Sequence, residues 1–282
     1  MITVLESINR SSEYLKNKGI ESPRINAELL LAYILDCKRL NLYLAFDRPL
    51  SEEELEKYRS LLKRRVKFEP LQYIIGRVEF YGMDFIVNPS VLIPRQETEI
   101  LVETIIEQYK DFEAVNILDI GTGSGNIAIS LAKNLNSYIT AVDISDDALK
   151  TANENALLNS ISNKINFIKK DFLIDDINMH DFDVVVSNPP YVSIEEYETL
   201  QPELKVYEPK VALTDFNSGF QFYEAISERS NQLLKNGGKL FFEIGRGQFP
   251  EVRKIMEKYN YQNITIFNDY MNIERVISGE KN

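Results

Sequence analysis

The spacing of apolar residues divides the chain into stretches of different secondary structure. Up to about residue 75 these residues recur at helical intervals, and Val4, Ile8 and Leu15 mark the first such stretch. This periodicity predicts a small helical bundle, whose second helix is apolar on nearly all sides and should be central. The predicted helices lie at 2–18, 22–35 and 41–46, and from 51 to about 66.

Beyond this bundle the apolar period changes to two residues. Val78 and Phe85 lie on either side of a turn near Gly82, which predicts a β-hairpin. A stretch stiffened by two prolines follows at 89–99, and a helix is predicted from about Glu97 to Tyr109. We expect the junction between two domains in this region.

The second half of the chain alternates apolar runs typical of buried strands with helical stretches. This alternation predicts a doubly wound α/β sheet with mostly parallel strands. The predicted strands lie at Asn116–Ile120, Tyr138–Val142, Ile165–Ile168, Phe182–Ser187 and Lys239–Ile244. The predicted helices lie at Asn126–Leu135, Asp146–Asn159, Phe220–Lys235 and Phe249–Tyr259. The last two strands, Asn263–Phe267 and Arg275–Ser278, should pair antiparallel at the sheet edge, because too little chain separates them for a helix.

The tetrapeptide Asn188-Pro189-Pro190-Tyr191 follows one of these buried strands directly. The chain must leave the sheet here, because neither proline has an N–H to give to a strand ladder. Ligands of open α/β sheets bind at such strand ends. An Asn amide with an aromatic ring nearby can hold a planar amino group, although an ordinary strand-exit turn remains an alternative interpretation.

A glycine loop, Gly121-Thr122-Gly123-Ser124-Gly125, lies between a predicted strand and a predicted helix. Glycines in this position permit close approach of the backbone to a ligand at a helix N-terminus. The next strand ends at Asp143, whose carboxylate can accept from both hydroxyls of a ribose. With Asp119 and Asp171-Phe172 nearby, these carboxylates favour a ligand with an ammonium and a sulfonium over a pyrophosphate. The alternative is a glycine-rich turn without a ligand.

Composition excludes several kinds of chemistry. The 282 residues carry a formal net charge of -11, which is unusual for a protein that binds duplex nucleic acid. A single cysteine, Cys37, and a single histidine, His180, predict no disulfide within the chain and no metal site. We interpret His180 as solvated, and the basic cluster Lys63, Arg64, Arg65 and Lys67 as a solvated helix end, with a binding patch as the alternative for the cluster. Since no run of membrane-spanning length and no N-terminal signal is present, we expect a cytoplasmic protein.

Several segments together resemble the release-factor glutamine methyltransferases, the PrmC/HemK family. The resemblance covers nearly the whole chain, and the segments at Glu69 and Val91 separate this family from other amino-methyltransferases. The segments that carry it are Asn26–Leu31, Glu69–Gly76, Val91–Arg95 with Glu97–Glu99, Ile117–Gly125, Asn188–Tyr191 and Tyr207–Pro209 with Ala212-Leu213.

The resemblance implies a Rossmann-like class I methyltransferase fold that depends on S-adenosylmethionine, with seven mostly parallel strands and an antiparallel edge. It further implies three parts: an N-terminal helical domain for substrate recognition at 1–76, a β-hairpin linker at 77–90 and a methyltransferase domain at 91–282. The implied substrate is the glutamine of the Gly-Gly-Gln motif in class I peptide chain release factors. The implied protein is a monomer that binds no nucleic acid directly.

The resemblance also assigns roles to the residues of both motifs. The residues expected to bind the cofactor are Gly121, Thr122, Gly123, Ser124, Gly125, Asp143, Phe172 and Asn188. The residues expected to bind the substrate are Asn188, Pro189, Pro190 and Tyr191, of which Asn188, Pro189 and Tyr191 are the expected catalytic residues. The chain departs from the family in Gln96, which replaces a usual proline, and in Phe172, which replaces a frequent tryptophan.

Three rival functions remain open at this point. An adenine amino group suits the tetrapeptide as well as a glutamine amide does, so a DNA adenine N6 methyltransferase is one alternative. Such an enzyme must extrude a base and bind a polyanion, which the acidic composition disfavours. The others are methylation of a different protein glutamine and a cofactor-binding interaction module without catalysis.

Overall fold

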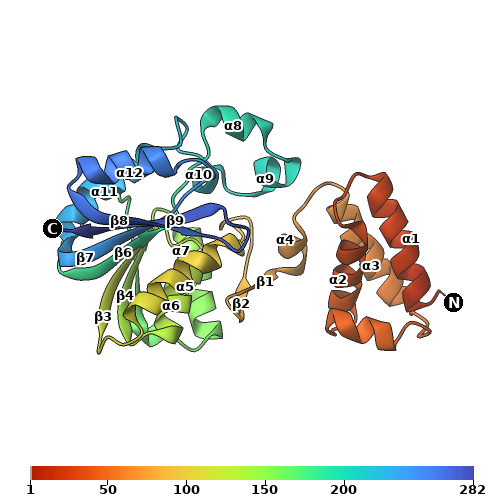
Figure 1. Cartoon of the computed structure of the whole chain (residues 1–282). Helices are drawn as coiled ribbons and strands as arrows, with labels where there is room; N and C mark the ends of the chain where they lie inside the picture. The colour runs from red at the N-terminus through yellow and green to blue at the C-terminus, as the bar shows by residue number, and fades with distance from the viewer. Residues whose placement is uncertain (1) are drawn as a thin grey trace. The chain divides into compact units, whose positions relative to one another are not determined.

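The computed structural model describes residues 2–282, and they form two compact units. One unit contains the chain up to Gly76 together with Pro202–Tyr207, and the other contains Arg77–Gln201 and Glu208–Asn282. Figure 1 shows the elements of both units along the chain. The two units are described separately below.

The helical unit contains the bundle that the sequence predicts. Its helices are α1 (Val4–Asn17), α2 (Pro23–Ile34), the 3-10 helix η1 (Arg39–Leu44), α3 (Glu52–Arg65), α4 (Leu71–Ile75) and α9 (Pro202–Tyr207). Thr3 with Glu6 and Ser51 with Glu54 form capping boxes, which fix the starts of α1 and α3. The central position predicted for α2 is confirmed, since it packs against α1, α3, α4 and η1.

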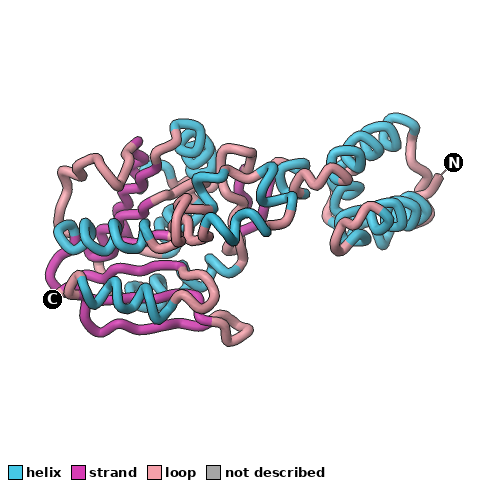
Figure 2. The backbone as a smooth tube through the Cα atoms, turned by 90° about the horizontal axis from the view of Figure 1, so that it is seen from above, coloured by secondary structure: helices cyan, strands magenta, loops and turns pink. Residues whose placement is uncertain are grey.

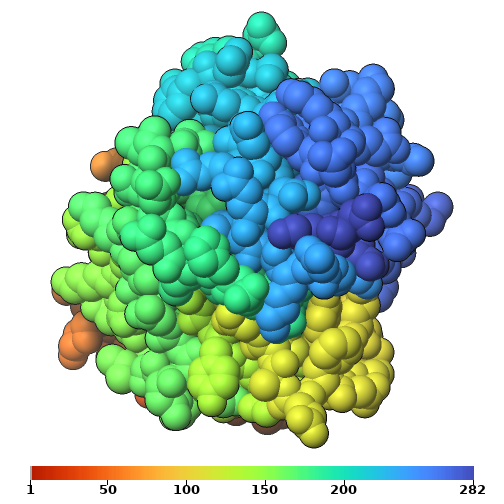
Figure 3. Space-filling view, turned by 90° about the vertical axis from the view of Figure 1, so that its left-hand side faces the viewer, coloured from red at the N-terminus to blue at the C-terminus, as the bar shows by residue number. Residues whose placement is uncertain are grey.

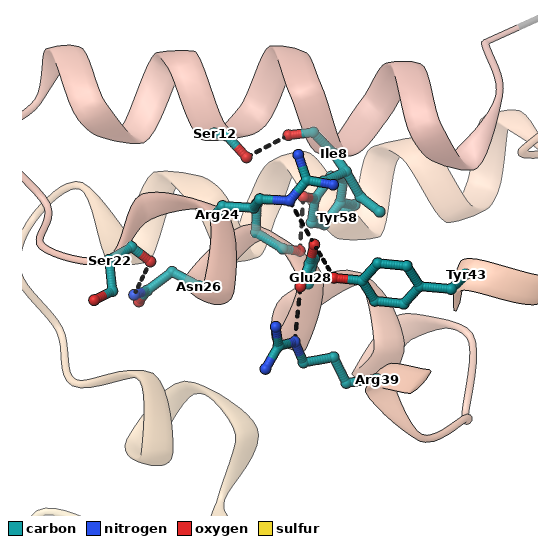
Figure 4. Close-up of polar contacts among 10 residues, drawn as sticks. Ile8, Ser12, Ser22, Arg24, Asn26, Glu28, Arg39, Tyr43 and Tyr58 are labelled. Atoms are coloured by element: carbon teal, nitrogen blue, oxygen red, sulfur yellow. Dashed lines mark hydrogen bonds and ion pairs between the residues drawn. The ribbon is translucent and has the colours of Figure 1, made fainter. Parts of the chain in front are cut away.

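A buried carboxylate lies inside this bundle. The Glu28 side chain on α2 is fully buried, and it accepts hydrogen bonds from Arg24 Nε at 2.9 Å, Arg39 Nε at 2.7 Å and the Tyr43 hydroxyl at 3.0 Å (Figure 4). Burial acts to raise the pKa of Glu28, yet the hydrogen bonds from Arg39, Tyr43 and Arg24 together hold it below its ordinary value. The cluster therefore ties η1 to α2 through a charge with three partners.

The basic cluster at the end of α3 is not simply solvated, so our interpretation of it was wrong for one residue. Arg65 is 4% exposed, and its guanidinium donates to Asn26 Oδ1 at 2.6 Å and to the Glu69 carbonyl at 3.1 Å. Its remaining nitrogen pairs with Glu203 on α9. Tyr207 completes the attachment of α9, since its hydroxyl donates to the Lys67 carbonyl at 2.9 Å. A short segment far along the chain is thus part of the helical unit.

The larger unit is built on a seven-stranded sheet of order β5-β4-β3-β6-β7-β9-β8. Its strands are β3 (Val115–Ile120), β4 (Ser137–Asp143), β5 (Ile165–Lys169), β6 (Phe182–Ser187), β7 (Leu234–Glu243), β8 (Tyr261–Asn268) and β9 (Glu274–Lys281). Neighbouring strands from β5 to β7 run parallel, whereas β9 is antiparallel to both β7 and β8. The predicted parallel sheet with an antiparallel pair at one edge is confirmed.

Helices cover both faces of this sheet, as Figures 1 and 2 show. They are α5 (Glu97–Tyr109), α6 (Asn126–Asn134), α7 (Asp146–Leu158), α11 (Gln221–Leu233) and α12 (Phe249–Lys258). Alternate strand residues face opposite sides: Ile117 and Val184 pack in one core with α5, α6 and α7 residues, and Leu118 and Val185 pack in another with α11 and α12 residues. A core is present on each side of the sheet, because the strands of a parallel sheet are buried on both faces.

The middle and the end of the chain interleave in this unit. Since β6 lies between β3 and β7, residues from the centre of the sequence pack directly against residues near its C-terminus. Figure 3 shows this on one face, where green and blue segments lie against each other.

The hairpin of β1 (Arg77–Phe80) and β2 (Met83–Ile86) packs on the larger unit. Phe80 and Phe85 belong to the α5-side core, and the Ile86 amide donates to Asn155 Oδ1 at 2.6 Å. Short helices that the sequence analysis did not predict are α4 and α9 in the helical unit, and α8 (Ile194–Thr199), α10 (Lys210–Leu213) and the 3-10 helix η2 (Ser162–Lys164) in the larger unit. Of the helices in residues 2–282, none combines the length and the apolar character that crossing a membrane requires.

The buried charge cluster gives a first testable prediction. Glu28→Gln should lower the free energy of local unfolding of α1–α3 by about 1–3 kcal/mol, because the hydrogen bonds lose their charge. Hydrogen exchange followed by mass spectrometry measures this, and Glu53→Gln, which removes an exposed pair with Lys57, is the matched control.

The effect of Glu28 should depend on pH in one direction. Because the folded-state pKa of Glu28 lies below its ordinary value of 4.5, its contribution is present above pH 4.5 and is lost as the pH falls through the folded pKa. Equal protection of wild type and Glu28→Gln at pH 7 would contradict a stabilising role for the cluster.

Candidate active site

The strand order of the larger unit reverses between β3 and β6, with β4 on one side and β7 on the other. At such a switch point the loops that follow neighbouring strands diverge and leave a crevice. A cavity of about 700 Å³ lies there, and the ends of β3, β4 and β6 contribute to its lining. The structure thus brings the glycine loop, Asp143 and Asn188 together around one cavity.

The glycine loop after β3 has a conformation that requires its glycines. Gly121, Gly123 and Gly125 all have positive φ, of 72°, 54° and 80°. Gly121 and Gly123 line the cavity, and a Cβ on either would meet no atom within 4 Å, so the space beside them is open. Gly125 instead packs inward, where a Cβ would lie 3.0 Å from the Ile129 side chain.

Like Gly125, the expected cofactor residues Thr122 and Ser124 do not line the cavity. The Thr122 hydroxyl donates to Asp119 Oδ2 at 2.6 Å, and the Ser124 hydroxyl donates to Asn126 Oδ1 at 3.1 Å. Both side chains are buried. The hydrogen bonds of these two hydroxyls stabilise the loop, while the backbone of Gly121 and Gly123 faces the cavity.

Two carboxyl groups lie beside the loop. Asp143, at the end of β4, accepts from the Gly123 amide at 2.8 Å and from the Ser145 amide at 2.9 Å, and burial raises its pKa. Asp119, on β3, is completely buried, and burial, together with the charge of Asp143, raises its pKa to about 7. Its Oδ1 has no hydrogen-bond partner among residues 2–282. Each oxygen of Asp143 keeps a further lone pair for a ligand hydroxyl.

Phe172 forms an apolar wall of the cavity, and it is 7% exposed. Its loop is held from α11, because Arg229 donates to the Leu173 carbonyl at 2.7 Å and to the Asp175 carbonyl. The guanidinium carbon of Arg229 lies 5.3 Å from the centre of the Phe172 ring, within the range of a cation–π contact. Arg229 therefore fixes the position of the Phe172 ring.

Asn188, Pro189 and Pro190 line the cavity at the end of β6. The Asn188 amide nitrogen donates to the hydroxyl of Thr98 on α5 at 3.2 Å. At the last residue of β6, the Ser187 hydroxyl donates to the Ile120 carbonyl of β3 at 2.8 Å, so the tetrapeptide and the glycine loop start from linked strand ends.

Tyr191 does not line this cavity. Its carbonyl accepts from the Gln248 amide at 2.9 Å, and its ring packs beside Gly245, where a Cβ would lie 3.1 Å from Tyr191 Cδ2. A Cβ on Gly219 would lie 2.5 Å from the Tyr191 carbonyl oxygen, so both glycines are required for the close packing of this residue. Burial raises the pKa of the Tyr191 hydroxyl, which is therefore neutral at physiological pH.

Several residues that shape the site were not identified from the sequence. Glu208 accepts from the Ile93 amide at 3.2 Å and pairs with Arg95, which fixes the loop before α5. Asp215 lines the cavity and accepts from three backbone amides of its own loop. Glu243 could have been identified as a buried acid from the sequence. It lies in the apolar run Phe-Phe-Glu-Ile-Gly at the end of β7, and a glutamate inside an apolar strand must be buried.

Two ranges of the chain match known families. Residues 6–76 match the PrmC N-terminal domain, and residues 95–203, which include the glycine loop and Asn188, match the methyltransferase small domain. The chain is 43% identical over 279 residues to a release factor glutamine methyltransferase of Fusobacterium nucleatum subsp. nucleatum, and the match covers 98% of this chain and 78% of that protein. The chain belongs to the release factor glutamine methyltransferases.

Other similar proteins agree with this family. A release factor glutamine methyltransferase of Chlorobaculum tepidum is 39% identical over 285 residues, which cover 98% of this chain and 96% of that protein. A solved methyltransferase from Pyrococcus furiosus has a TM-score of 0.54 at 17% identity, over 80% of this chain and 98% of that chain, and it shows the fold alone. The resemblance to the release factor glutamine methyltransferases and the class I methyltransferase fold are confirmed.

The buried Asp119 gives a second prediction. Its folded-state pKa of about 7 lies above its ordinary 3.8, so the folded state binds more protons than the unfolded state between these values. Stability should therefore fall as the pH rises through this window and level off above it. Asp119→Asn removes this term, so its melting temperature should fall less than that of the wild type between pH 5.5 and 8.

Calorimetric melting of both proteins measures this difference. Asp111→Asn changes an exposed carboxylate and should follow the wild type. Parallel curves for the wild type and Asp119→Asn would show that the buried carboxyl does not titrate in this range.

Proposed function

We propose that this chain transfers a methyl group from S-adenosylmethionine to the side-chain amide nitrogen of the glutamine in the Gly-Gly-Gln motif of class I peptide chain release factors. The relatives named release factor glutamine methyltransferase, at 43% and 39% identity over 98% of the chain, support this substrate. The observation that carries the chemistry is the orientation of Asn188 beside the cavity. Its nitrogen donates to Thr98, which leaves its oxygen available to a substrate amide.

The cavity fits the cofactor in size and in chemistry. A volume of about 700 Å³ is in the range of small-molecule sites, and the open space beside Gly121 and Gly123 admits a ligand close to the backbone. Asp143 would accept from the ribose hydroxyls, and Phe172 would pack on the adenine. The sulfonium of the bound cofactor supplies an electrophilic methyl group.

The residues of the chain orient the substrate amide for the reaction. An amide nitrogen is a poor nucleophile, because its lone pair is delocalised into the carbonyl. The Asn188 side-chain oxygen and the Pro189 carbonyl would accept from the two hydrogens of the substrate amide and fix its plane. Such alignment is worth about 7–11 kcal/mol of barrier in favourable cases.

The same two acceptors would also stabilise the transition state. Positive charge develops on the amide nitrogen as the methyl group transfers, so both hydrogen bonds strengthen there, as catalysis requires. The methylated nitrogen is acidic and loses its proton to water. This scheme needs no histidine base, and the one histidine, His180, lies exposed in the loop before β6.

The helical unit would provide recognition of the protein substrate. A single glutamine side chain offers too little area for selectivity, so the release factor must be contacted elsewhere. Large apolar side chains on this unit are exposed, among them Leu40 at 77% and Leu44 at 89%, both on η1. An apolar surface of this kind suits a protein partner. The proposed setting is a monomer in the cytoplasm, where translation terminates, without direct contact to nucleic acid.

The third prediction tests the reaction itself. With labelled cofactor, the wild type should methylate a release factor and leave an adenine-containing DNA duplex unlabelled. Asn188→Ala should lower kcat by about 100-fold or more, as expected for loss of an acceptor that acts in the transition state. Its cofactor affinity, measured by calorimetry, should change much less. Labelling of the duplex in place of the release factor would overturn the proposed function, and equal losses of kcat and affinity would make Asn188 chiefly a cofactor ligand.

The fourth prediction concerns the helical unit. The double substitution Leu40→Ser with Leu44→Ser should raise KM for the release factor several-fold and leave kcat unchanged, because these exposed residues would contact the partner. Methylation of a short Gly-Gly-Gln peptide should not change. Leu157→Ser on α7, where the leucine is 67% exposed, is the matched control. An unchanged KM in the double variant would remove η1 from the recognition surface.

A further inference from the structure

The turn between β8 and β9 presents two neighbouring apolar side chains to solvent. Tyr270 is 86% exposed and Met271 is 82% exposed, more than any other large apolar side chain that the structure describes in the larger unit. Single exposed apolar residues are common on protein surfaces, but turns favour small and polar residues at their tips. Two large apolar side chains side by side at such a tip therefore suggest a role outside the fold.

The turn keeps its shape through other side chains. The Asp269 carboxylate accepts from the amides of Met271 and Ile273, both at 2.9 Å. The Asn272 amide donates to the Asp269 carbonyl at 2.8 Å, and Asn272 has a positive φ of 61°, which asparagine tolerates. The side chains of Tyr270 and Met271 take no part in these bonds, so substitution of either should leave the turn intact.

The Tyr270 ring is nevertheless held in place. Its hydroxyl donates to Glu103 Oε2 on α5 at 2.8 Å, and this bond raises the pKa of the hydroxyl, which stays protonated. The same helix carries Thr98, whose hydroxyl accepts from the Asn188 amide. The tip is thus attached to the helix that contacts the tetrapeptide, and a side chain ordered in advance loses little conformational freedom when it binds a partner.

The strand directions place this tip at the edge of the sheet that carries the site. Ser187 of β6 pairs with Phe242 of β7, which pairs with Ile277 of the antiparallel β9, so two strand spacings, about 10 Å, separate β6 from β9. Strand β9 begins at Glu274, three residues or about 10 Å beyond Ile277 toward this edge. The tip therefore lies on the order of 15 Å from Asn188.

The proposed reaction determines which molecule comes to this edge. The glutamine must reach Asn188 from a folded protein, so the surface around its Gly-Gly-Gln loop lies over the same edge of the sheet. A standard interface buries about 800 Å² on each partner and is about 30 Å across. A footprint centred on Asn188 would therefore extend as far as the tip.

We propose that the β8–β9 turn is a contact for the release factor, in which Tyr270 and Met271 pack on an apolar patch beside the Gly-Gly-Gln loop. This inference rests on the proposed function and places a recognition surface on the larger unit, in addition to the one on η1. Tyrosine and methionine suit this role, because both are enriched in protein interfaces. The contact contributes to affinity for the whole factor and takes no part in methyl transfer.

The test measures KM and kcat for a full-length release factor at saturating cofactor. The double variant Tyr270→Ser with Met271→Ser should raise KM about 5- to 20-fold, as for truncation of interface anchors, and leave kcat within about twofold. A blocked Gly-Gly-Gln tripeptide spans only about 10 Å and cannot reach the tip from Asn188. Its kcat/KM should therefore be the same with the variant and the wild type.

Two further double variants serve as controls. Tyr270→Phe with Met271→Leu keeps the apolar area and should retain KM within about twofold. Tyr138→Ser with Leu157→Ser removes exposed apolar residues from the opposite edge of the sheet, where β4 begins and α7 ends, and should not change KM. Melting temperatures of all variants should match the wild type, because the substituted side chains are exposed.

The outcomes distinguish this inference from the proposed function. A wild type that does not methylate the release factor overturns both. With an active wild type, an unchanged KM in Tyr270→Ser with Met271→Ser, or an equal loss with the tripeptide, overturns the contact alone. Sedimentation supplies a last check: a wild-type dimer that this variant dissociates would make the tip a contact between copies of the chain and also overturn the inference.

Discussion

The site depends on the parallel pairing of β3 with β6 at the centre of the sheet. In this register Ile120 pairs with Ser187, and the Ser187 hydroxyl donates to the Ile120 carbonyl at 2.8 Å. The next residues of the two strands are Gly121 and Asn188, so the glycine loop and the tetrapeptide leave the sheet side by side. Both motifs line the cavity, the glycine loop with Gly121 and Gly123 and the tetrapeptide with Asn188, Pro189 and Pro190. A shift of one residue in this register would turn the alternate side chains of β6 to the opposite face.

Much of this arrangement could be predicted from local signals. Apolar runs gave the strands from Asn116 onward and their order along the chain, and α5 begins and ends where the sequence indicated. Glycine and proline marked the two loops, because their backbone preferences are strong and local. The short helices α8 to α10 were missed, since helices of four to six residues have too few turns for a periodic pattern.

The residues that could not be predicted act through partners distant in sequence. Thr98 lies on α5, far from Asn188 in the sequence, and only the fold brings its hydroxyl to the Asn188 amide. Arg65 was assigned to a solvated helix end, yet it is buried against Asn26 and α9. A polar side chain in an apolar setting indicates that a partner exists, but sequence periodicity does not identify that partner.

Burial raises the pKa of three acids in the sheet that carries the site. Asp119 and Asp143 lie on the neighbouring strands β3 and β4, and Glu243 lies at the end of β7. None of them needs to exchange a proton with the substrate. Asp119 holds the glycine loop by accepting from the Thr122 hydroxyl, and Asp143 holds it by accepting from the Gly123 amide. If catalysis is mainly orientation, protonation of such groups changes the rate by changing the positions of the residues that they hold, and not by a direct part in methyl transfer. The pH dependence of turnover in this chain would then report the state of its scaffold, because the amide nucleophile requires no ionised base.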